Sequence, residues 1–274
     1  LSYLLISWHK GMKIYYLCSM PNSITFLGTG TSQGIPMIGC NCNVCKSDDK
    51  RDKRLRSSAL VEWEGLKILI DAGPDFRYQM LRENISHLDA ILLTHQHKDH
   101  TGGLDDVRAL NYFEKRSFPI FCEKRVEESL KMEYSYAFAK EKYPGVPDYT
   151  IININEDPFS IDGKEVVPIR VMHYKLPILG FRFGNMAYIT DANYINDTEL
   201  EKLKNLDILV LNCVRLEKHI SHYSLSEAID VIRSLNPKKG YLTHLSHQMP
   251  THRESSLLLP ENIELAYDGL KLYF

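Results

Sequence analysis

The chain has 274 residues, of which 44% are hydrophobic and 25% are charged, so it can bury one large core. Its formal net charge is −2, with 33 Lys and Arg mixed among 35 Asp and Glu, which leaves no basic stripe for a nucleic-acid duplex. No apolar run approaches the ~20 residues of a membrane span. From the charge distribution we expect no nucleic acid as a partner, and from the apolar runs we expect no membrane.

The N-terminal segment differs in character from the rest of the chain. Residues 1–19 are apolar and aromatic, but Lys10 and Lys13 interrupt them, and the order of a secretory signal is poorly matched. We expect residues 1–19 to be a loosely attached extension and residues 20–274 to form a single domain. Cys18, Cys122 and Cys213 are scattered in apolar context, which predicts reduced thiols and a cytoplasmic location.

Strand-like runs recur along the chain and outnumber the helices. They cover residues 24–27, 59–63, 67–70, 90–93, 120–122, 166–169, 181–183, 187–189 and 208–211. Gly65 and Gly184-Asn185 separate neighbouring runs and predict hairpin turns, so each sheet is partly antiparallel. Helical periodicity covers residues 76–82, 126–142, 198–206 and 224–235. Two mixed sheets with helices outside them explain this order, and the predicted fold is a four-layer αββα sandwich.

Two of these helices carry further signals. The helix over residues 224–235 begins with Ser224, followed three residues later by Glu227, which is a capping box. The helix over residues 126–142 has aromatic groups on more than one face. Packing against the core explains such a helix, but a lid over the active site or a homodimer contact would also explain it.

A dense polar cluster follows the apolar run 90–93. His95, His97, Asp99 and His100 lie within six residues and are followed by Gly102-Gly103. His95 and His97 are two residues apart, so both rings can face one ion, whereas Asp99 and His100 turn toward a second ion. The cluster predicts a metal site in the loop at the end of a strand.

The pattern His-x-His-x-Asp-His resembles the signature of the metallo-β-lactamase superfamily. That family pattern also expects an Asp, a His, a second Asp and a last His at strand ends, and this chain has Asp71, His173, Asp191 and His244 there. The resemblance implies two catalytic ions, zinc or manganese, that share Asp191. The first would be held by His95, His97 and His173, and the second by Asp99, His100 and His244. Asp71 would orient ligand loops through hydrogen bonds.

A second cluster consists of thiols. Cys40, Cys42 and Cys45 are within reach of one tetrahedral ion, and His247, three residues after His244, is a candidate fourth ligand. We expect a structural zinc there. The Cys-x-Cys-x-x-Cys element, the opening over residues 26–36 and the His-x-x-His pair resemble the PhnP-type branch, which consists of cyclic phosphodiesterases.

The resemblance implies a dinuclear metal-dependent hydrolase that acts on a small or cyclic phosphodiester. Asp99, Asp191 and His222 would be catalytic, because His222 corresponds to a position near the leaving group and a His is suited to donate a proton at neutral pH. A plain surface His explains the same sequence. The candidates for phosphate contact are Arg54, Arg56, Ser57, Ser58 and Arg108, and solvated side chains explain all five equally.

Other functions use the same site residues. A lactone, a thioester or the 3′ end of a precursor tRNA could be the substrate, and a metal-binding protein without turnover is a further alternative. Four histidines match no motif position and are expected to be exposed: His9, His87, His219 and His252.

Overall fold

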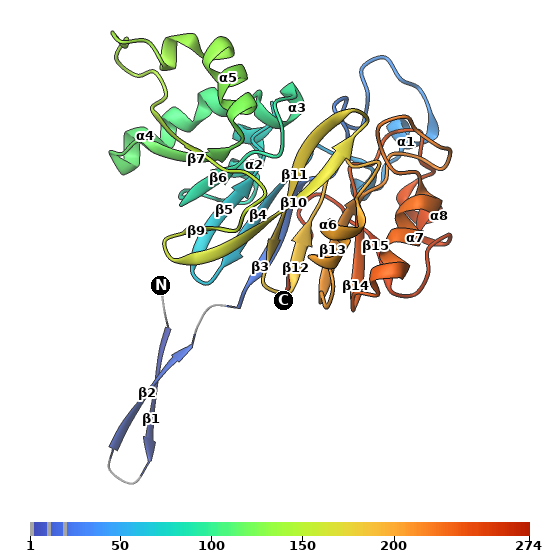
Figure 1. Cartoon of the computed structure of the whole chain (residues 1–274). Helices are drawn as coiled ribbons and strands as arrows, with labels where there is room; N and C mark the ends of the chain where they lie inside the picture. The colour runs from blue at the N-terminus through green and yellow to red at the C-terminus, as the bar shows by residue number, and fades with distance from the viewer. Residues whose placement is uncertain (1–2, 10–11, 19–20) are drawn as a thin grey trace.

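The computed structural model describes residues 3–9, 12–18 and 21–274, with side chains from residue 21 onward (Figure 1). Strands β1 (Tyr3–His9) and β2 (Met12–Cys18) pair antiparallel with each other and with no strand of the two larger sheets. The side chains of His9 and Cys18, and the predicted domain start at residue 20, lie outside the described part of the chain. A loosely attached extension over residues 1–19 remains a prediction.

Two seven-stranded sheets form the centre of the molecule. The first contains, in spatial order, β16 (Lys271–Tyr273), β3 (Ser23–Gly28), β4 (Ser58–Trp63), β5 (Leu66–Ile70), β6 (Ala90–Leu92), β7 (Phe118–Cys122) and β8 (Tyr149–Asn153). The second contains β15 (Ile263–Leu265), β14 (Lys239–Thr243), β13 (Ile208–Asn212), β12 (Met186–Tyr188), β11 (Leu176–Phe183), β10 (Lys164–His173) and β9 (Phe159–Ile161).

The two sheets repeat one connection pattern. In the first sheet the pairs from β16 to β5 are antiparallel and those from β5 to β8 are parallel. In the second sheet the pairs from β9 to β12 are antiparallel and those from β12 to β15 are parallel. The hairpins predicted at Gly65 and Gly184 join β4 to β5 and β11 to β12. The mixed character of both sheets is therefore confirmed.

Helices cover the two outer faces (Figure 1). The first sheet is covered by α2 (Phe76–Arg82), the 3-10 turn η2 (Leu104–Val107), α4 (Arg108–Glu114), α5 (Lys124–Glu133) and η3 (Ser135–Ala137). The second sheet is covered by α6 (Asp197–Glu201) and α7 (Leu225–Leu235). Three short elements lie in the loops, α1 (Asn43–Lys46), η1 (Lys50–Asp52) and α3 (Lys98–Thr101), and α8 (His252–Ser256) follows β14.

Alternating side chains separate the four layers. On β5, Ile68 and Ile70 pack in the core between the sheets, whereas Leu69 packs under the helices of the outer face. This period of two is what a strand with both faces buried requires. Phe181 and Tyr188 fill the inter-sheet core from the other sheet. The predicted αββα sandwich is thus confirmed, with one apolar cluster at each of its three interfaces.

Two predicted helices are too long. The helix predicted over residues 126–142 ends at Glu133, because Tyr134 leaves helical geometry (φ −108°, ψ 37°) to bury its ring and donate a hydrogen bond to the Thr101 carbonyl. Tyr134 and Phe138 pack in the apolar cluster under the outer face of the first sheet, whereas Tyr136 and Tyr143 are exposed. The helix predicted over residues 198–206 ends at Glu201, and turns follow it. None of the described helices combines the length and apolar composition needed to cross a bilayer.

Candidate metal centre

The polar residues gather where strands of both sheets end. Asp71 follows β5, Asp191 follows β12 and His244 follows β14, and all three adopt left-handed backbone conformations, with φ of 61°, 58° and 56°. A sharp turn of this kind directs each side chain across the sheet edge instead of along the strand. His173 is the last residue of β10. Residues 95–100 pass from the end of β6 into α3.

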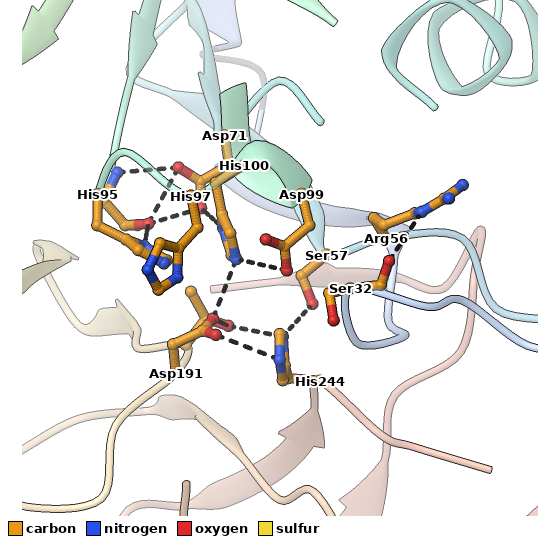
Figure 2. Close-up of polar contacts among 12 residues, drawn as sticks. Ser32, Arg56, Ser57, Asp71, His95, His97, Asp99, His100, Asp191 and His244 are labelled. Atoms are coloured by element: carbon orange, nitrogen blue, oxygen red, sulfur yellow. Dashed lines mark hydrogen bonds and ion pairs between the residues drawn. The ribbon is translucent and has the colours of Figure 1, made fainter. Parts of the chain in front are cut away.

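Figure 2 shows Asp191 and His244 lying across from His95, His97 and His100. Asp191 uses its two oxygens differently. Its Oδ2 lies 3.3 Å from His100 Nε2, and its Oδ1 lies 3.2 Å from His244 Nε2. Asp99 Oδ2 also lies 3.3 Å from His100 Nε2. A single carboxylate therefore faces imidazoles from both sheets.

Among the described residues, four groups of His and Asp side chains have their ligand atoms within 4.8 Å of one another, which is close enough to share an ion. They are His95, His97 and His173; His95, His100 and Asp191; Asp99, Asp191 and His244; and His173, Asp191 and His222. Asp191 belongs to three of the four groups. All seven residues predicted as ligands of the catalytic ions are brought together, and His222 joins them.

The imidazoles are oriented through their Nδ1 atoms. His100 Nδ1 lies 2.6 Å from Asp71 Oδ2, and His95 Nδ1 lies 2.9 Å from Thr94 Oγ1, whose hydroxyl donates to Asp71. His173 Nδ1 donates to the Ser221 carbonyl at 3.0 Å, and His244 Nδ1 lies 3.0 Å from Ser57 Oγ. In each case Nε2 is the ring nitrogen that remains for an ion. This is the arrangement that metal-binding histidines adopt in proteins.

The donor set fits divalent ions. Nε2 of His95 and of His100 is buried and has no hydrogen-bond partner in the described part of the chain, and a buried polar atom of this kind needs a ligand. Burial, and next the neighbouring His100, lower the pKa of His95, so this ring is neutral as a metal ligand must be. Burial opposes ionisation of Asp191, but His244 and His100 nevertheless hold its pKa well below the usual range.

Two glycines allow this packing. A Cβ on Gly73 would lie 2.0 Å from the Asp99 carbonyl oxygen, and one on Gly103 would lie 2.1 Å from the Gly73 carbonyl oxygen. The turn after β5 thus contacts α3 backbone to backbone. Asp71, on the same turn, also accepts a hydrogen bond from the Thr94 amide at 2.9 Å. Asp71 therefore fixes the loop that carries His95 and His100.

A second centre lies beside the first. Cys40, Cys42, Cys45 and His247 place their ligand atoms within 4.8 Å of one another, and His247 Nδ1 lies 3.2 Å from Cys40 Sγ. The backbone amide of Cys45 lowers the pKa of Cys42 to about 6, whereas burial raises the pKa of Cys45 to about 11. One thiolate is thus available at neutral pH before any ion binds. Cys122 and Cys213 are buried free thiols, as predicted.

A pocket of about 300 Å³ opens onto the His and Asp cluster. His222 lines it, with Nε2 3.2 Å from His244 Nε2 and 3.4 Å from Asp191 Oδ1. Burial, and next the neighbouring His244, lower the pKa of His222 to about 3. His222 is therefore neutral at pH 7 in the free protein, and donating a proton would require the negative charge of a bound substrate to raise its pKa.

Comparison with known proteins decides the family. A family model described as a beta-lactamase superfamily domain matches residues 67–245. The chain belongs to the beta-lactamase superfamily. It is also similar to a solved structure of a new diphosphatase from the PhnP family, at 40% identity and a TM-score of 0.86 over 92% of this chain and 98% of that one. The predicted PhnP-like branch is thereby confirmed.

Two further relatives have other names. A protein named octanoyltransferase from Porphyromonas gingivalis is 44% identical over 89% of this chain, but the chain spans only 50% of that protein. A ribonuclease Z from Pyrobaculum islandicum is 28% identical over 86% of this chain and 90% of its own length.

Several sequence-based candidates for phosphate contact are wrong in this superfamily member. Arg54 is 4% exposed and donates to Thr29 Oγ1 and the Ala266 carbonyl. Ser57 and Ser58 are buried, and Ser58 donates to the Asp71 carbonyl. Arg108 pairs with Asp105 and does not line the pocket. Arg56 pairs with Asp75 and does not line the pocket.

Sequence reasoning also missed part of the site. His219 was expected to be exposed but is half-buried and lines the pocket, and His252, expected to be exposed, is buried against Arg54. His87 is exposed as expected. No spacing signal marks His219, because its place depends on the loop before α7 folding back over β10. Ser57 was a candidate for phosphate contact, but its contact with His244, 187 residues away, has no signal in the sequence.

Proposed function

We propose that this protein is a dinuclear metal-dependent phosphodiester hydrolase acting on a small or cyclic substrate. The observation that carries the proposal is the position of Asp191, which belongs to three of the four groups of His and Asp side chains. These groups join it to His95 and His173 of the first proposed set and to Asp99, His100 and His244 of the second. A carboxylate can bridge two ions, whereas an imidazole cannot. The relatives named diphosphatase and ribonuclease Z both act on phosphate linkages according to their names, which supports a phosphate ester as substrate.

The proposed ligands divide into two sets that share Asp191. His95, His97 and His173 would hold the first ion, Asp99, His100 and His244 the second, and Cys40, Cys42, Cys45 and His247 a structural zinc. Nitrogen and oxygen donors of this kind accept zinc or manganese. When bound, two divalent ions supply an acidified water as nucleophile and positive charge opposite the phosphoryl oxygens.

The residues of the chain have three roles in this proposal. Asp71, Thr94, Ser57 and the Ser221 carbonyl fix the imidazoles, so no ligand must reorient when substrate arrives. The pocket of about 300 Å³ is large enough for a small ester. His222, at the pocket wall, would donate a proton to the leaving oxygen once the phosphoryl charge raises its pKa.

A thioester is the second candidate substrate. It is favoured by one observation, the 44% identity to a protein named octanoyltransferase, of which this chain spans half. The name octanoyltransferase can refer to the activity of the other half of that protein, which this chain does not match. The cysteine centre and the similarity to the PhnP-family diphosphatase favour the phosphodiester.

A substrate panel tests the proposal. Protein loaded with zinc or with manganese would be assayed on bis(4-nitrophenyl) phosphate, cyclic phosphodiesters, a dinucleoside diphosphate, a lactone and an octanoyl thioester. We expect turnover of phosphodiesters that disappears after chelation and returns with metal. Turnover of the thioester or the lactone, without turnover of any phosphate ester, would overturn the proposal. Absence of turnover on every substrate by protein whose metal sites are fully loaded would also overturn it.

A further inference from the structure

The cysteines whose side chains the structure describes fall into two classes. Cys122 and Cys213 are fully buried, and burial raises the pKa of each thiol to about 12. Such thiols stay protonated and are shielded from a dissolved oxidant. Cys40 and Cys42 are half-buried, and Cys45, which is 6% exposed, packs in the same small cluster. Oxidation of the described cysteines should therefore begin at the cysteine centre.

The thiols of this centre are close enough to react with one another. The ligand atoms of Cys40, Cys42, Cys45 and His247 all lie within 4.8 Å of one another. Cys42 and Cys45 are also joined by a hydrogen bond, since the Cys45 amide donates to Cys42 Sγ at 3.4 Å. Residues three apart on a helical turn are neighbours, so rotation of the two side chains can bring the sulfurs to the roughly 2 Å of a disulfide bond.

Cys40 is the thiol that contacts His247 most closely. Its Sγ lies 3.2 Å from His247 Nδ1, whereas the Sγ of Cys42 lies 3.6 Å from the same nitrogen. Cys40 is also only two residues from Cys42, which is a poorer spacing for a disulfide than the three residues between Cys42 and Cys45. The geometry therefore favours Cys42 and Cys45 as the reacting pair.

We propose that Cys42 and Cys45 are a site of reversible oxidation, which hydrogen peroxide converts to a disulfide bond. The more exposed sulfur of Cys42 attacks one peroxide oxygen, the O–O bond breaks, and the second oxygen leaves as water. The Cys45 thiol then attacks the sulfenic acid on Cys42, and its S–O bond breaks to release a second water. Two thiols thus lose two electrons and two protons, and one peroxide becomes two waters.

Oxidation removes ligands from the cysteine centre. A tetrahedral zinc site needs four ligands, and cysteine serves as one in its thiolate form. A disulfide between Cys42 and Cys45 would leave only Cys40 and His247. Any ion held there should therefore be released when the disulfide forms.

The effect should reach the pocket through His247. The Cys42 thiol lies 3.7 Å from the His247 carbonyl oxygen, to which it donates, and His247 lines the pocket. Leu245 and Ser246 are held separately, by hydrogen bonds to carbonyls of other segments. Oxidation should therefore loosen the turn at His247 and leave His244 in place beside the catalytic ions.

Differential alkylation locates the disulfide. Free thiols of zinc-loaded, peroxide-treated protein would be blocked with iodoacetamide, disulfides would be reduced, and the released thiols would be labelled with N-ethylmaleimide and located by tandem mass spectrometry. We expect the second label on Cys42 and Cys45, and the first on Cys40 and Cys122. A second label on Cys40 or Cys122 instead of this pair would overturn the proposal, as would its absence from all cysteines.

Metal content is the second measurement. Elemental analysis after gel filtration should show a fall from about three equivalents to about two as the disulfide forms. Dithiothreitol followed by zinc should restore both the thiols and the third equivalent. A complete disulfide in protein that keeps three equivalents would contradict the release of an ion from this centre.

Variants identify the reacting pair. Cys45→Ser removes the thiol that closes the disulfide, so Cys42 should stop at the sulfenic acid, which dimedone traps. Cys40→Ser keeps the pair and should still form the disulfide. Cys122→Ala is the matched control and should respond like the wild type. A disulfide that forms in Cys45→Ser but not in Cys40→Ser would show that the pair is wrong.

The thiol and metal measurements do not depend on the proposed function. Failure of every phosphodiester in the substrate panel would leave both of them interpretable. If phosphodiesters are cleaved, turnover should fall several-fold on oxidation and return on reduction, because the turn at His247 is loosened. Unchanged turnover by fully oxidised protein would overturn the link between the cysteine centre and the pocket.

Discussion

At the residue scale, function depends on side chains at the ends of strands. Asp71, Asp191 and His244 each adopt a left-handed conformation that L-residues occupy at a cost, and each follows a strand that ends at the metal centre, Asp71 in the first sheet and the other two in the second. Their neighbours compensate for this strain. Thr94 and His100 hydrogen-bond to Asp71, and His100 and His244 contact the two oxygens of Asp191. A change at one of these positions should alter chemistry more than stability.

Asp191→Asn tests the shared carboxylate. The amide keeps the shape but loses the charge that both proposed ions need, so hydrolysis should fall roughly 10³-fold or more. Elemental analysis should show fewer than two catalytic metal equivalents, with an unchanged circular dichroism spectrum. Asp230→Asn, on the exposed face of α7, is the matched control. Retained turnover of every phosphodiester by the Asp191 variant would contradict the bridging role.

His222→Ala tests the proton donor. If His222 protonates the leaving oxygen, the rate on an alkyl phosphodiester should fall ~10²- to 10⁴-fold. The loss should be smaller on bis(4-nitrophenyl) phosphate, whose leaving group departs without a proton. Because His222 also lies within ligand distance of His173 and Asp191, metal content must be measured alongside. Equal losses on both substrates would exclude the acid role, and a lost metal equivalent would make His222 a ligand.

At the element scale, the turn between β14 and α8 joins the two centres. Residues 244–248 carry His244 toward Asp191, His247 toward the thiols and Gln248 into the pocket. The turn is anchored from both sides, since the Leu245 amide donates to the Thr29 carbonyl and the Ser246 hydroxyl donates to the Val214 carbonyl. The cysteine centre should therefore act on the catalytic pocket by holding this turn.

Cys42→Ser tests the cysteine centre. A hydroxyl does not replace a thiolate ligand, so metal content should drop from about three equivalents to about two. Thermal stability should fall first, because structural zinc contributes directly to folding. Cys122→Ala, a buried thiol of β7 that packs in the core under the helices of the first sheet, is the control that should keep all its metal. Unchanged metal content in the Cys42 variant would show that no ion is held there.

At the scale of the whole molecule, a buried polar network ties the C-terminal segment to the first sheet. Asp268 accepts from the amides of Thr29 and Leu55, and Arg54 donates to Thr29 and lies 3.2 Å from His252 Nδ1. These contacts span about 200 residues of sequence, since Arg54 and His252 are 198 positions apart. The guanidinium requires a neutral His252, because Nδ1 must act as the acceptor.

His252 should make stability depend on acidity. Burial, and next Arg54, lower the pKa of His252 from its ordinary 6.5 to about 4. As the pH falls, His252 is therefore protonated at a higher pH in the unfolded chain than in the folded protein. Its contribution to the free energy of unfolding is present above pH 6.5 and is lost between pH 6.5 and 4. The loss should be on the order of 1–3 kcal/mol.

His252→Asn keeps an acceptor for Arg54 but does not titrate. Its urea-unfolding free energy should therefore fall less than that of the wild type between pH 7 and 4.5. Metal loss in acid affects both proteins alike, so the difference between them isolates His252. Parallel curves for the two proteins would contradict the prediction.

The sequence by itself determined the fold class and the membership of both centres. Continuous apolar runs predicted the central strands, because strands buried on both faces need apolar residues at successive positions. The edge strands β8, β9, β15 and β16 were not predicted. The density of His, Asp and Cys predicted the ligand-type residues. The capping box at Ser224 and Glu227 was also predicted and is present, since its signal is local. The site roles assigned to these residues remain proposals.

Only the tertiary structure decided which polar residues face the pocket. Arg54 and His252 resemble surface residues in sequence yet are buried against each other, whereas His219 and Gln248 line the pocket without any motif. The helix after Val126 ends early because Tyr134 gains a buried hydrogen bond with Thr101, 33 residues away. In each case the residue that makes the contact is distant in the chain. The surrounding sequence therefore gives no signal of the contact, which forms only when the folded chain packs.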